Sequence, residues 1–231
     1  MRKVLFFVIG LFLFFSCSSE NENTMYVKGS IKGLKKGTLY LQKQIDSLII
    51  SIDSVKVNGT EDFLLTDQVL SPEMYYLTLG NSNKKIPFFG EKDTIEITSR
   101  LDKFILKAKI SGSENQDLLD NYYEIKDKFR DQNLDLIKAE FEARKSANQD
   151  SILLIQNKLN NLVRRKYLYT TNFAINNANH EVAPYIALTE LNDATVKLLD
   201  TIKNSLSEDV KKSKYGIQLS DFVLKIKESK K

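Results

Sequence analysis

The distribution of glycine and the spacing of apolar residues both change at Gly112-Ser113. Eight of the nine glycines lie at or before Gly112, and Gly216 is the only later one. Before this point, short runs of β-branched and aromatic residues alternate with turn residues, as expected for half-buried strands. After it, apolar residues recur every three or four positions, which is the period of an amphipathic helix. The chain is therefore expected to fold as a β-rich unit followed by a helical unit.

The N-terminal half contains a series of short segments with the composition of strands. They are Met25–Ile31, Thr38–Gln42, Leu48–Ile52, Ser54–Val57, Tyr75–Leu79, Ile86–Phe89, Thr94–Thr98 and Phe104–Ile110. A strong turn signal, Asn58-Gly59, follows the fourth segment. Short strands with this composition and spacing predict an antiparallel β-sandwich or open barrel.

The C-terminal half contains five stretches with apolar residues at helical spacing. They are Asp117–Arg144, Ser151–Tyr169, a helix that opens near Pro184, Val196–Leu206 and Leu219–Ile226. Their apolar stripes are expected to pack the helices together, and a groove for a partner is the alternative. The predicted fold class is therefore α+β, with a β-domain over residues 25–111 and a helical domain over residues 112–231.

Residues 1–16 have the composition of a secretory signal sequence. The basic residues Arg2 and Lys3 precede an apolar run from Val4 to Phe15, and the small residue Ser16 ends the segment. A permanent transmembrane anchor is the alternative. It is disfavoured because the run is shorter than the roughly 20 residues that span a bilayer.

Cys17 is the only cysteine of the chain and stands directly after the apolar run. This arrangement resembles the signal of bacterial lipoproteins, in which the cysteine is acylated, with palmitate among the chains, and becomes the mature N-terminus. Residues 17–24 would then form a polar tether to the membrane. An acylated Cys17 leaves no thiol for a disulfide, a nucleophile or a metal site.

The positive net charge of the chain arises largely from the signal sequence. Arg2 and Lys3 contribute two of the four net positive charges, so residues 17–231 carry a net charge of +2. A balance this close to neutral gives no reason to expect a nucleic-acid partner.

No set of residues in the sequence indicates a catalytic or metal site. His180 is the only histidine, and its surroundings predict a surface loop. A Ser-His-Asp arrangement needs a positioned base, and a zinc site without thiols needs more than one histidine. We therefore expect no enzyme, no cofactor and no metal. A glycosidase-type carboxylate pair stays open, because any two acids can meet in a fold.

Aspartate followed by serine or threonine and then an aliphatic residue occurs five times. The hydroxyl residues are Ser47, Ser54, Thr94, Ser151 and Thr201. The pattern resembles the acceptor pattern for O-glycosylation of exported bacterial proteins, and glycans require exposed positions. Local structure is the alternative, because aspartate, serine and threonine favour turns and helix caps.

The order of several short motifs resembles the family of domains of unknown function 4369 (DUF4369). The motifs are Val27–Ile31, Gly37–Leu41, Ile52–Gly59, Pro72–Leu77, Ile86–Phe89 and Asp93–Ile97. The helical half resembles the segment that often follows this domain. In many relatives that segment leads into a thioredoxin-like oxidoreductase domain with a CxxC motif, and this sequence has no such motif. The resemblance implies a lipid-anchored protein of the outer membrane made of the accessory part alone.

We therefore expect a non-enzymatic lipoprotein with a binding or scaffolding role, anchored in the outer membrane, and a protein partner in the envelope. The alternative is an accessory subunit of a thiol–disulfide system whose redox domain is on another chain. The aromatic pairs Tyr75-Tyr76 and Phe88-Phe89 are expected in the core of the β-domain, and a ligand surface is the alternative.

Overall fold

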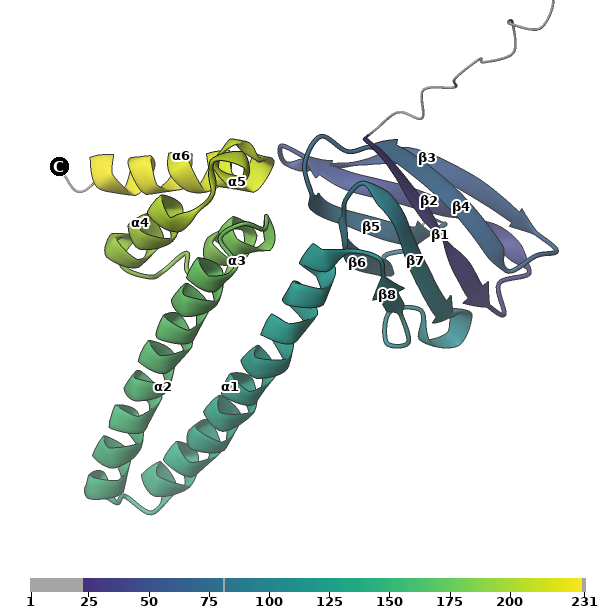
Figure 1. Cartoon of the computed structure of the whole chain (residues 1–231). Coiled ribbons are helices and arrows are strands. Elements are labelled where there is room, and N and C mark those ends of the chain that lie inside the picture. The colour runs from purple at the N-terminus through teal and green to yellow at the C-terminus, as the bar shows by residue number, and fades with distance from the viewer. Residues whose placement is uncertain (1–22, 81, 230–231) are drawn as a thin grey trace, which may run out of the picture.

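The computed structural model describes residues 23–80 and 82–229. The expected signal sequence 1–16, Cys17 and most of the expected tether 17–24 lie outside the described residues. The described residues form two packed β-sheets followed by six α-helices (Figure 1). This confirms the predicted α+β class, and the two sheets are not closed into a barrel.

Each sheet contains four strands. Sheet A has the order β4-β1-β7-β8, and sheet B has the order β3-β2-β5-β6. The strands are β1 (Thr24–Lys32), β2 (Lys36–Ile45), β3 (Leu48–Asn58), β4 (Asp62–Gln68), β5 (Glu73–Leu79), β6 (Lys85–Gly90), β7 (Asp93–Arg100) and β8 (Lys109–Ser111).

One strand pair differs from the antiparallel arrangement that the sequence predicts. Strands β1 and β7 run parallel, with Met25 opposite Asp93 and Lys32 opposite Arg100, while the other pairs are antiparallel. Sheet A is therefore mixed. Alternation of apolar residues defines the two faces of a strand but carries no information on the direction of its neighbour.

Two segments of the β-domain differ from the sequence-based expectation. Strand β4 was not expected from the sequence, although its residues alternate: Phe63 and Leu65 are buried and Leu64 between them is exposed. The expected strand Phe104–Ile110 is wrong over most of its length, because only its end belongs to β8. Phe104 follows a short 3₁₀ helix and is buried, and its carbonyl accepts a hydrogen bond from Ser99 Oγ (2.6 Å), which holds the chain in a turn.

The helical region consists of a long hairpin and a compact group of shorter helices (Figure 1). The helices are α1 (Glu114–Lys145), α2 (Gln149–Asn176), α3 (Val182–Glu190), α4 (Val196–Ser205), α5 (Glu208–Lys212) and α6 (Lys214–Glu228). Ser113 caps α1 by accepting a hydrogen bond from Gln116 N, and Asn148 caps α2 in the same way from Ser151 N. Such caps satisfy backbone donors that the first helical turn leaves unpaired.

Strands β5 and β6 of sheet B are covered on both faces. The inner face of the sheet joins sheet A in the main hydrophobic core, where the rings of Tyr75 and Phe88 stack with centroids 5.9 Å apart. Its outer face packs against the helices through a second cluster of buried residues, namely Met74, Phe89, Leu119, Tyr122, Val182, Ile186 and Tyr215. Strands β5 and β6 therefore need apolar residues on both faces. The expectation of a core position holds for Tyr75 and Phe88, and Phe89 lies in the junction with the helices.

Two buried hydrogen bonds cross this junction, and a third joins α1 to α3 beside it. Met74 N donates to Tyr215 Oη (3.0 Å), Phe89 N donates to Gln116 Oε1 (2.8 Å), and Val182 N donates to Asn115 Oδ1 (2.8 Å). Strand β6 is at the edge of sheet B, so the side chain of Gln116 pairs a backbone donor that the sheet itself leaves unpaired. Each bond satisfies a group whose burial alone would be costly.

Candidate functional site

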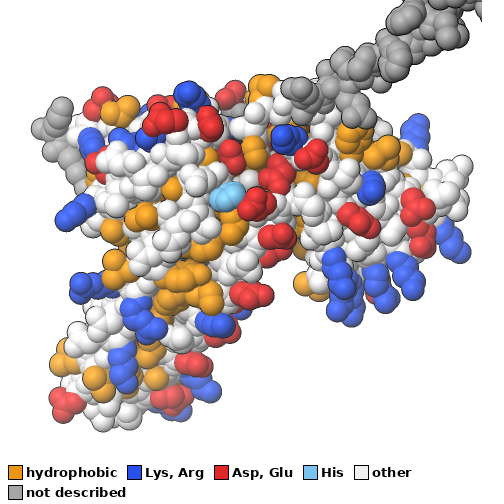
Figure 2. Space-filling view, viewed as in Figure 1, with side chains coloured by type: hydrophobic (Ala, Val, Ile, Leu, Met, Phe, Trp, Pro, Cys, Tyr) orange, Lys and Arg blue, Asp and Glu red, His pale blue; other side chains and the backbone are white. Residues whose placement is uncertain are grey.

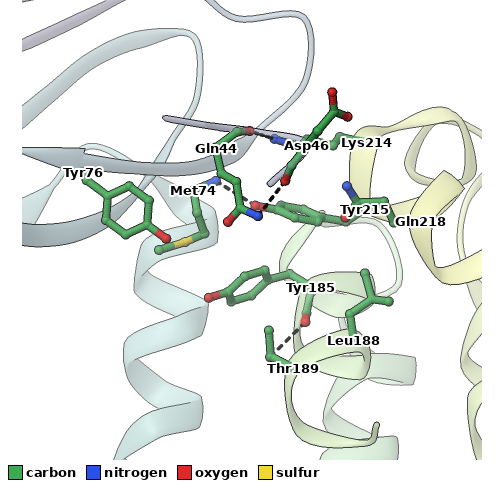
Figure 3. A pocket seen from close by; sticks show the side chains of 10 residues that line it. All are labelled: Gln44, Asp46, Met74, Tyr76, Tyr185, Leu188, Thr189, Lys214, Tyr215 and Gln218. Atoms are coloured by element: carbon green, nitrogen blue, oxygen red, sulfur yellow. Dashed lines mark hydrogen bonds between the residues drawn. The ribbon is translucent and has the colours of Figure 1, made fainter. Parts of the chain in front are cut away.

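A cavity of about 270 Å³ lies at the junction between sheet B and the helices (Figure 3). We call it the tyrosine cavity. Its lining comes from the β2–β3 hairpin, strand β5 and helices α3 and α6, and consists of Gln44, Asp46, Met74, Tyr76, Tyr185, Leu188, Thr189, Lys214, Tyr215 and Gln218. Because four separate segments contribute, the cavity exists only when the β-domain and the helices are packed together.

Tyr215 is held in place by both parts of the chain. It lies in the first turn of α6, where Ser213 caps the helix by accepting a hydrogen bond from Gly216 N (3.3 Å). Gly216 lets α6 start tightly against α5, since a Cβ there would lie 2.0 Å from Val210 O. Burial raises the pKa of Tyr215. The hydroxyl therefore keeps its proton at neutral pH while its oxygen accepts the hydrogen bond from Met74 N.

Two further tyrosines form walls of the cavity (Figure 3). Tyr185 from α3 packs against the ring of Tyr215 with centroids 5.1 Å apart, and burial raises its pKa. Tyr76 from β5 is half-buried, and Lys85 Nζ lies 5.7 Å from the centroid of its ring. Tyrosine offers a flat apolar face and a polar hydroxyl, and both suit a binding surface that is partly wet.

The polar groups of the cavity are uncharged or paired except for Asp46, whose carboxylate points away from the other labelled side chains (Figure 3). The uncharged groups are Gln44, Thr189 and Gln218, all on the exposed rim. Lys214 Nζ donates to the carbonyl of Gln44 (2.7 Å) and forms an ion pair with Glu73, so its charge is compensated. The arrangement suits a neutral ligand that has apolar faces as well as hydrogen-bonding groups.

Glu73 connects the cavity to a half-buried group of charges inside the β-domain. It pairs with Lys214 from α6 and with Lys43 from β2 (3.4 Å). Lys43 also pairs with Asp67 (2.7 Å), whose Oδ2 accepts a hydrogen bond from Tyr75 Oη (2.7 Å). Because losing one partner of a half-buried pair leaves an uncompensated charge, this network fixes the position of the cavity's lysine.

A second cavity, of about 360 Å³, gathers acidic residues and His180 near the start of α1. Glu91 and Glu181 both accept hydrogen bonds from Asn115 Nδ2 (2.8 and 3.4 Å), and Glu91 also accepts one from Glu114 N. Burial raises the pKa of Glu181. His180 lies in the loop between α2 and α3, as predicted, with Nε2 3.7 Å from Glu114 Oε1.

The acids of this second cavity have a structural explanation. A carboxylate at the start of a helix is stabilising because it meets unpaired backbone donors and the positive end of the helix dipole. Glu91 does this for α1, and Asn115 links it to Glu181 beside α3. Among residues 23–80 and 82–229, no three His, Cys, Asp or Glu side chains are placed to hold a metal ion.

The five hydroxyl residues that follow aspartates in the repeated sequence pattern do not line the tyrosine cavity or the second cavity. Ser47, Ser54, Thr94 and Thr201 are exposed and Ser151 is half-buried, and Cys17 lies outside the described residues.

The aspartates that precede these hydroxyls have local roles of their own. Asp46 and Asp93 adopt positive φ (52° and 80°), Asp53 accepts a hydrogen bond from Thr66 N (2.9 Å), and Asp200 pairs with Lys203 and Lys227. The four exposed hydroxyls meet the requirement for glycosylation. The local roles of the aspartates equally fit the structural explanation of the pattern, so glycosylation and local structure remain alternatives.

Sequence reasoning singled out Tyr76 but not Tyr185 or Tyr215. Tyr185 lies on the helix that was expected near Pro184, whose apolar residues were assigned to the core, and Tyr215 lies just before the expected stripe Leu219–Ile226. The available signal is the clustering of three tyrosines with Gln44 and Gln218, and that clustering exists only in the folded chain.

The fold defines an α+β protein in which an open two-sheet β-domain carries a helical region on the outer face of one sheet. Residues 25–119 match the family model of the domain of unknown function DUF4369, which agrees with the resemblance found in the sequence. The match continues through Leu119, and so includes the first turns of α1 with Asn115 and Gln116. No curated protein and no solved structure matches the chain significantly. None of the helices within the described ranges is long and apolar enough to cross a bilayer.

Proposed function

We propose that the chain is a lipid-anchored lipoprotein of the outer membrane with a non-enzymatic binding role, and that the tyrosine cavity is its ligand site. The observation that carries the binding role is the cavity itself, in which three tyrosines, uncharged polar groups, the paired Lys214 and Asp46 surround a preformed space. Small-molecule sites are usually concave, largely apolar and preformed, with few polar groups that set orientation.

The side chains of the cavity are held in position before any ligand arrives. Tyr215 is fixed by its hydrogen bond from Met74 N and by Tyr185, and Lys214 is fixed by Glu73 and the Gln44 carbonyl. Immobilised groups lose little conformational entropy on binding, so more of the interaction energy is available as affinity. A ligand here would also bridge the β-domain and the helices.

Replacing Tyr76 with alanine is expected to weaken ligand binding at least about tenfold, which corresponds to about 1.4 kcal/mol. The change removes one wall, and the half-buried side chain contributes less to the core than Tyr215. Ligand-observed NMR with a panel of neutral oligosaccharides and uncharged peptides, followed by calorimetry of the hits, measures the effect. Tyr26→Ala is the matched control, because Tyr26 is an exposed strand tyrosine of sheet A. Equal affinities in both variants would contradict the assignment of the site.

The anchor is tested by intact mass and membrane fractionation of the native chain beside a Cys17→Ala variant. We expect acyl groups on Cys17 of the native chain and release of the variant from the membrane, since several acyl chains hold a protein stably. The same mass spectra report hexose additions at Ser47, Ser54, Thr94, Ser151 and Thr201. An unacylated thiol on a native chain that is released from the membrane would refute the anchor, and five unmodified hydroxyls would refute the glycans.

The second candidate function is that of an accessory subunit of a thiol–disulfide system. The match of residues 25–119 to DUF4369 supports it, because the sequence resemblance links this domain to thioredoxin-like partners. Co-purification of a thioredoxin-like protein with the native chain would favour this function over the binding of a small ligand.

A further inference from the structure

The distal part of the α1–α2 hairpin is a two-helix layer with little core of its own. We call residues 126–165 the arm, which projects away from the rest of the molecule (Figure 1). Its buried interior near the tip is limited to Ala143, Ile152 and Ile155, with Leu136 and Leu159 packed against them. Helices of this kind normally bury one face against a further layer.

One side of the arm has a hollow with polar edges in its middle and a stripe of exposed apolar residues toward its tip. In the middle, a hollow of about 520 Å³ opens between the helices, with Arg130 and Asn133 of α1 and Val163 of α2 at its edges. Residues four apart share a helix face, so the stripe on α1 continues from these edges. Leu134, Ile137 and Phe141 form that stripe and are 56, 49 and 64 % exposed.

Helix α2 contributes to the same side. Val163 at the edge of the hollow is 48 % exposed, and Leu153 is 60 % exposed. Ten residues correspond to about 2.8 helical turns, so Leu153 lies about a quarter-turn from Val163, at the edge of the same side. Figure 2 shows a cluster of hydrophobic side chains near the middle of the hairpin and scattered ones among charged side chains toward the tip.

The opposite side of the arm is polar apart from Leu154, which is 56 % exposed and lies four residues before Lys158 on the same helix face. The hollow there, of about 360 Å³, is edged by Gln132, Asp135, Lys158, Asn161 and Arg165, with Leu136 and Leu162 only at its base. The arm is therefore amphipathic as a layer, which is the property of one half of a four-helix bundle.

We propose that the apolar side of the arm pairs with the same side of a second copy of this chain, to form a four-helix bundle. A two-fold axis makes such a patch self-complementary, because each residue meets its counterpart or near neighbours. The side measures roughly 30 Å by 20 Å from the rise and packing distance of helices. Two copies would bury roughly 1,200 Å² in total, which is at the lower end of specific interfaces.

The charges around the hollow favour a second copy over an anionic surface. Arg130 pairs with Asp127 (2.7 Å) and Asp131 (3.2 Å), while Lys126 and Lys166 both pair with the nearly buried Glu190 (2.6 and 3.2 Å). These cations are compensated within the chain, so two like surfaces can approach each other with little repulsion. A membrane or nucleic-acid surface would instead be met by uncompensated cations.

The pairing is tested by cross-linking in the mature chain, residues 17–231, with Cys17→Ala, so that any introduced cysteine is the only thiol. Ile137→Cys should form a disulfide-linked dimer. Asp135→Cys, two residues away on the polar side, should yield at least tenfold less. Adding Phe141→Asp to Ile137→Cys should abolish the product, because it places a charge in the interface.

Sedimentation velocity on the chain with Cys17→Ala alone should show a monomer–dimer equilibrium at concentrations up to about 100 µM, because an interface of this size binds weakly. Phe141→Asp should remove the dimer. Circular dichroism checks that Phe141→Asp remains folded, as expected for an exposed position. Equal cross-linking at positions 135 and 137, or a monomer at every concentration, would overturn the proposal.

Discussion

Replacing Phe89 with alanine is expected to lower the free energy of unfolding by about 3–5 kcal/mol, the usual cost of deleting a buried aromatic ring. Phe89 is fully buried on the face of β6 that meets the helices. Its ring contacts those of Tyr185 and Tyr215, with centroids 5.4 and 6.0 Å away. Because both tyrosines also line the tyrosine cavity, the substitution should reduce ligand binding without touching the cavity directly.

The matched control is Phe88→Ala, one residue earlier on the same strand. Phe88 is equally buried but faces the core between the two sheets, where it stacks on Tyr75. Denaturant unfolding should show comparable losses of stability. Hydrogen exchange should differ, with faster exchange in α3 and α6 for Phe89→Ala and in the two sheets for Phe88→Ala. Identical exchange patterns would mean that the junction has no separate stability.

The aromatic pairs illustrate how far the sequence predicts this fold. Strand β5 and strand β6 do not alternate cleanly, and the sequence interpretation placed both aromatic pairs in one core. Burial of β5 and β6 on both faces is the reason for the missing alternation. A single sequence cannot separate a residue buried between two sheets from its neighbour buried against a helix, because both environments select large apolar side chains.

The tyrosine cavity could not be predicted from the sequence for a related reason. Its segments are separated by up to 170 residues, as the bond from Lys214 to the Gln44 carbonyl shows. In each segment the local pattern already has a sufficient explanation as a turn, a strand or a helix stripe. The helix positions were predictable because their spacing is local. The way in which α3 and α6 meet sheet B depends on contacts such as Met74 with Tyr215, which local patterns do not encode.

Replacing Gly29 with alanine is expected to lower the free energy of unfolding by about 3 kcal/mol or more, the upper range for forced overpacking. Gly29 lies in β1, between β4 and β7, opposite Ile97 of the parallel neighbour. A Cβ at this position would lie 1.8 Å from Ile97 O and 2.6 Å from Ile97 C. These are backbone atoms, so the clash is relieved only by moving β1 away from β7.

Gly59→Ala separates this steric effect from the general cost of replacing glycine. Gly59 has a φ of 88°, and a Cβ there would meet nothing within 4 Å. Its substitution should cost only the left-handed backbone penalty of about 1–2 kcal/mol. Urea unfolding of the two variants measures the loss in the free energy of unfolding for each. An insoluble Gly29→Ala chain beside a folded Gly59→Ala chain would also support the steric explanation. Equal losses would show that close approach of β1 and β7 is not what requires glycine within the Val27–Ile31 motif.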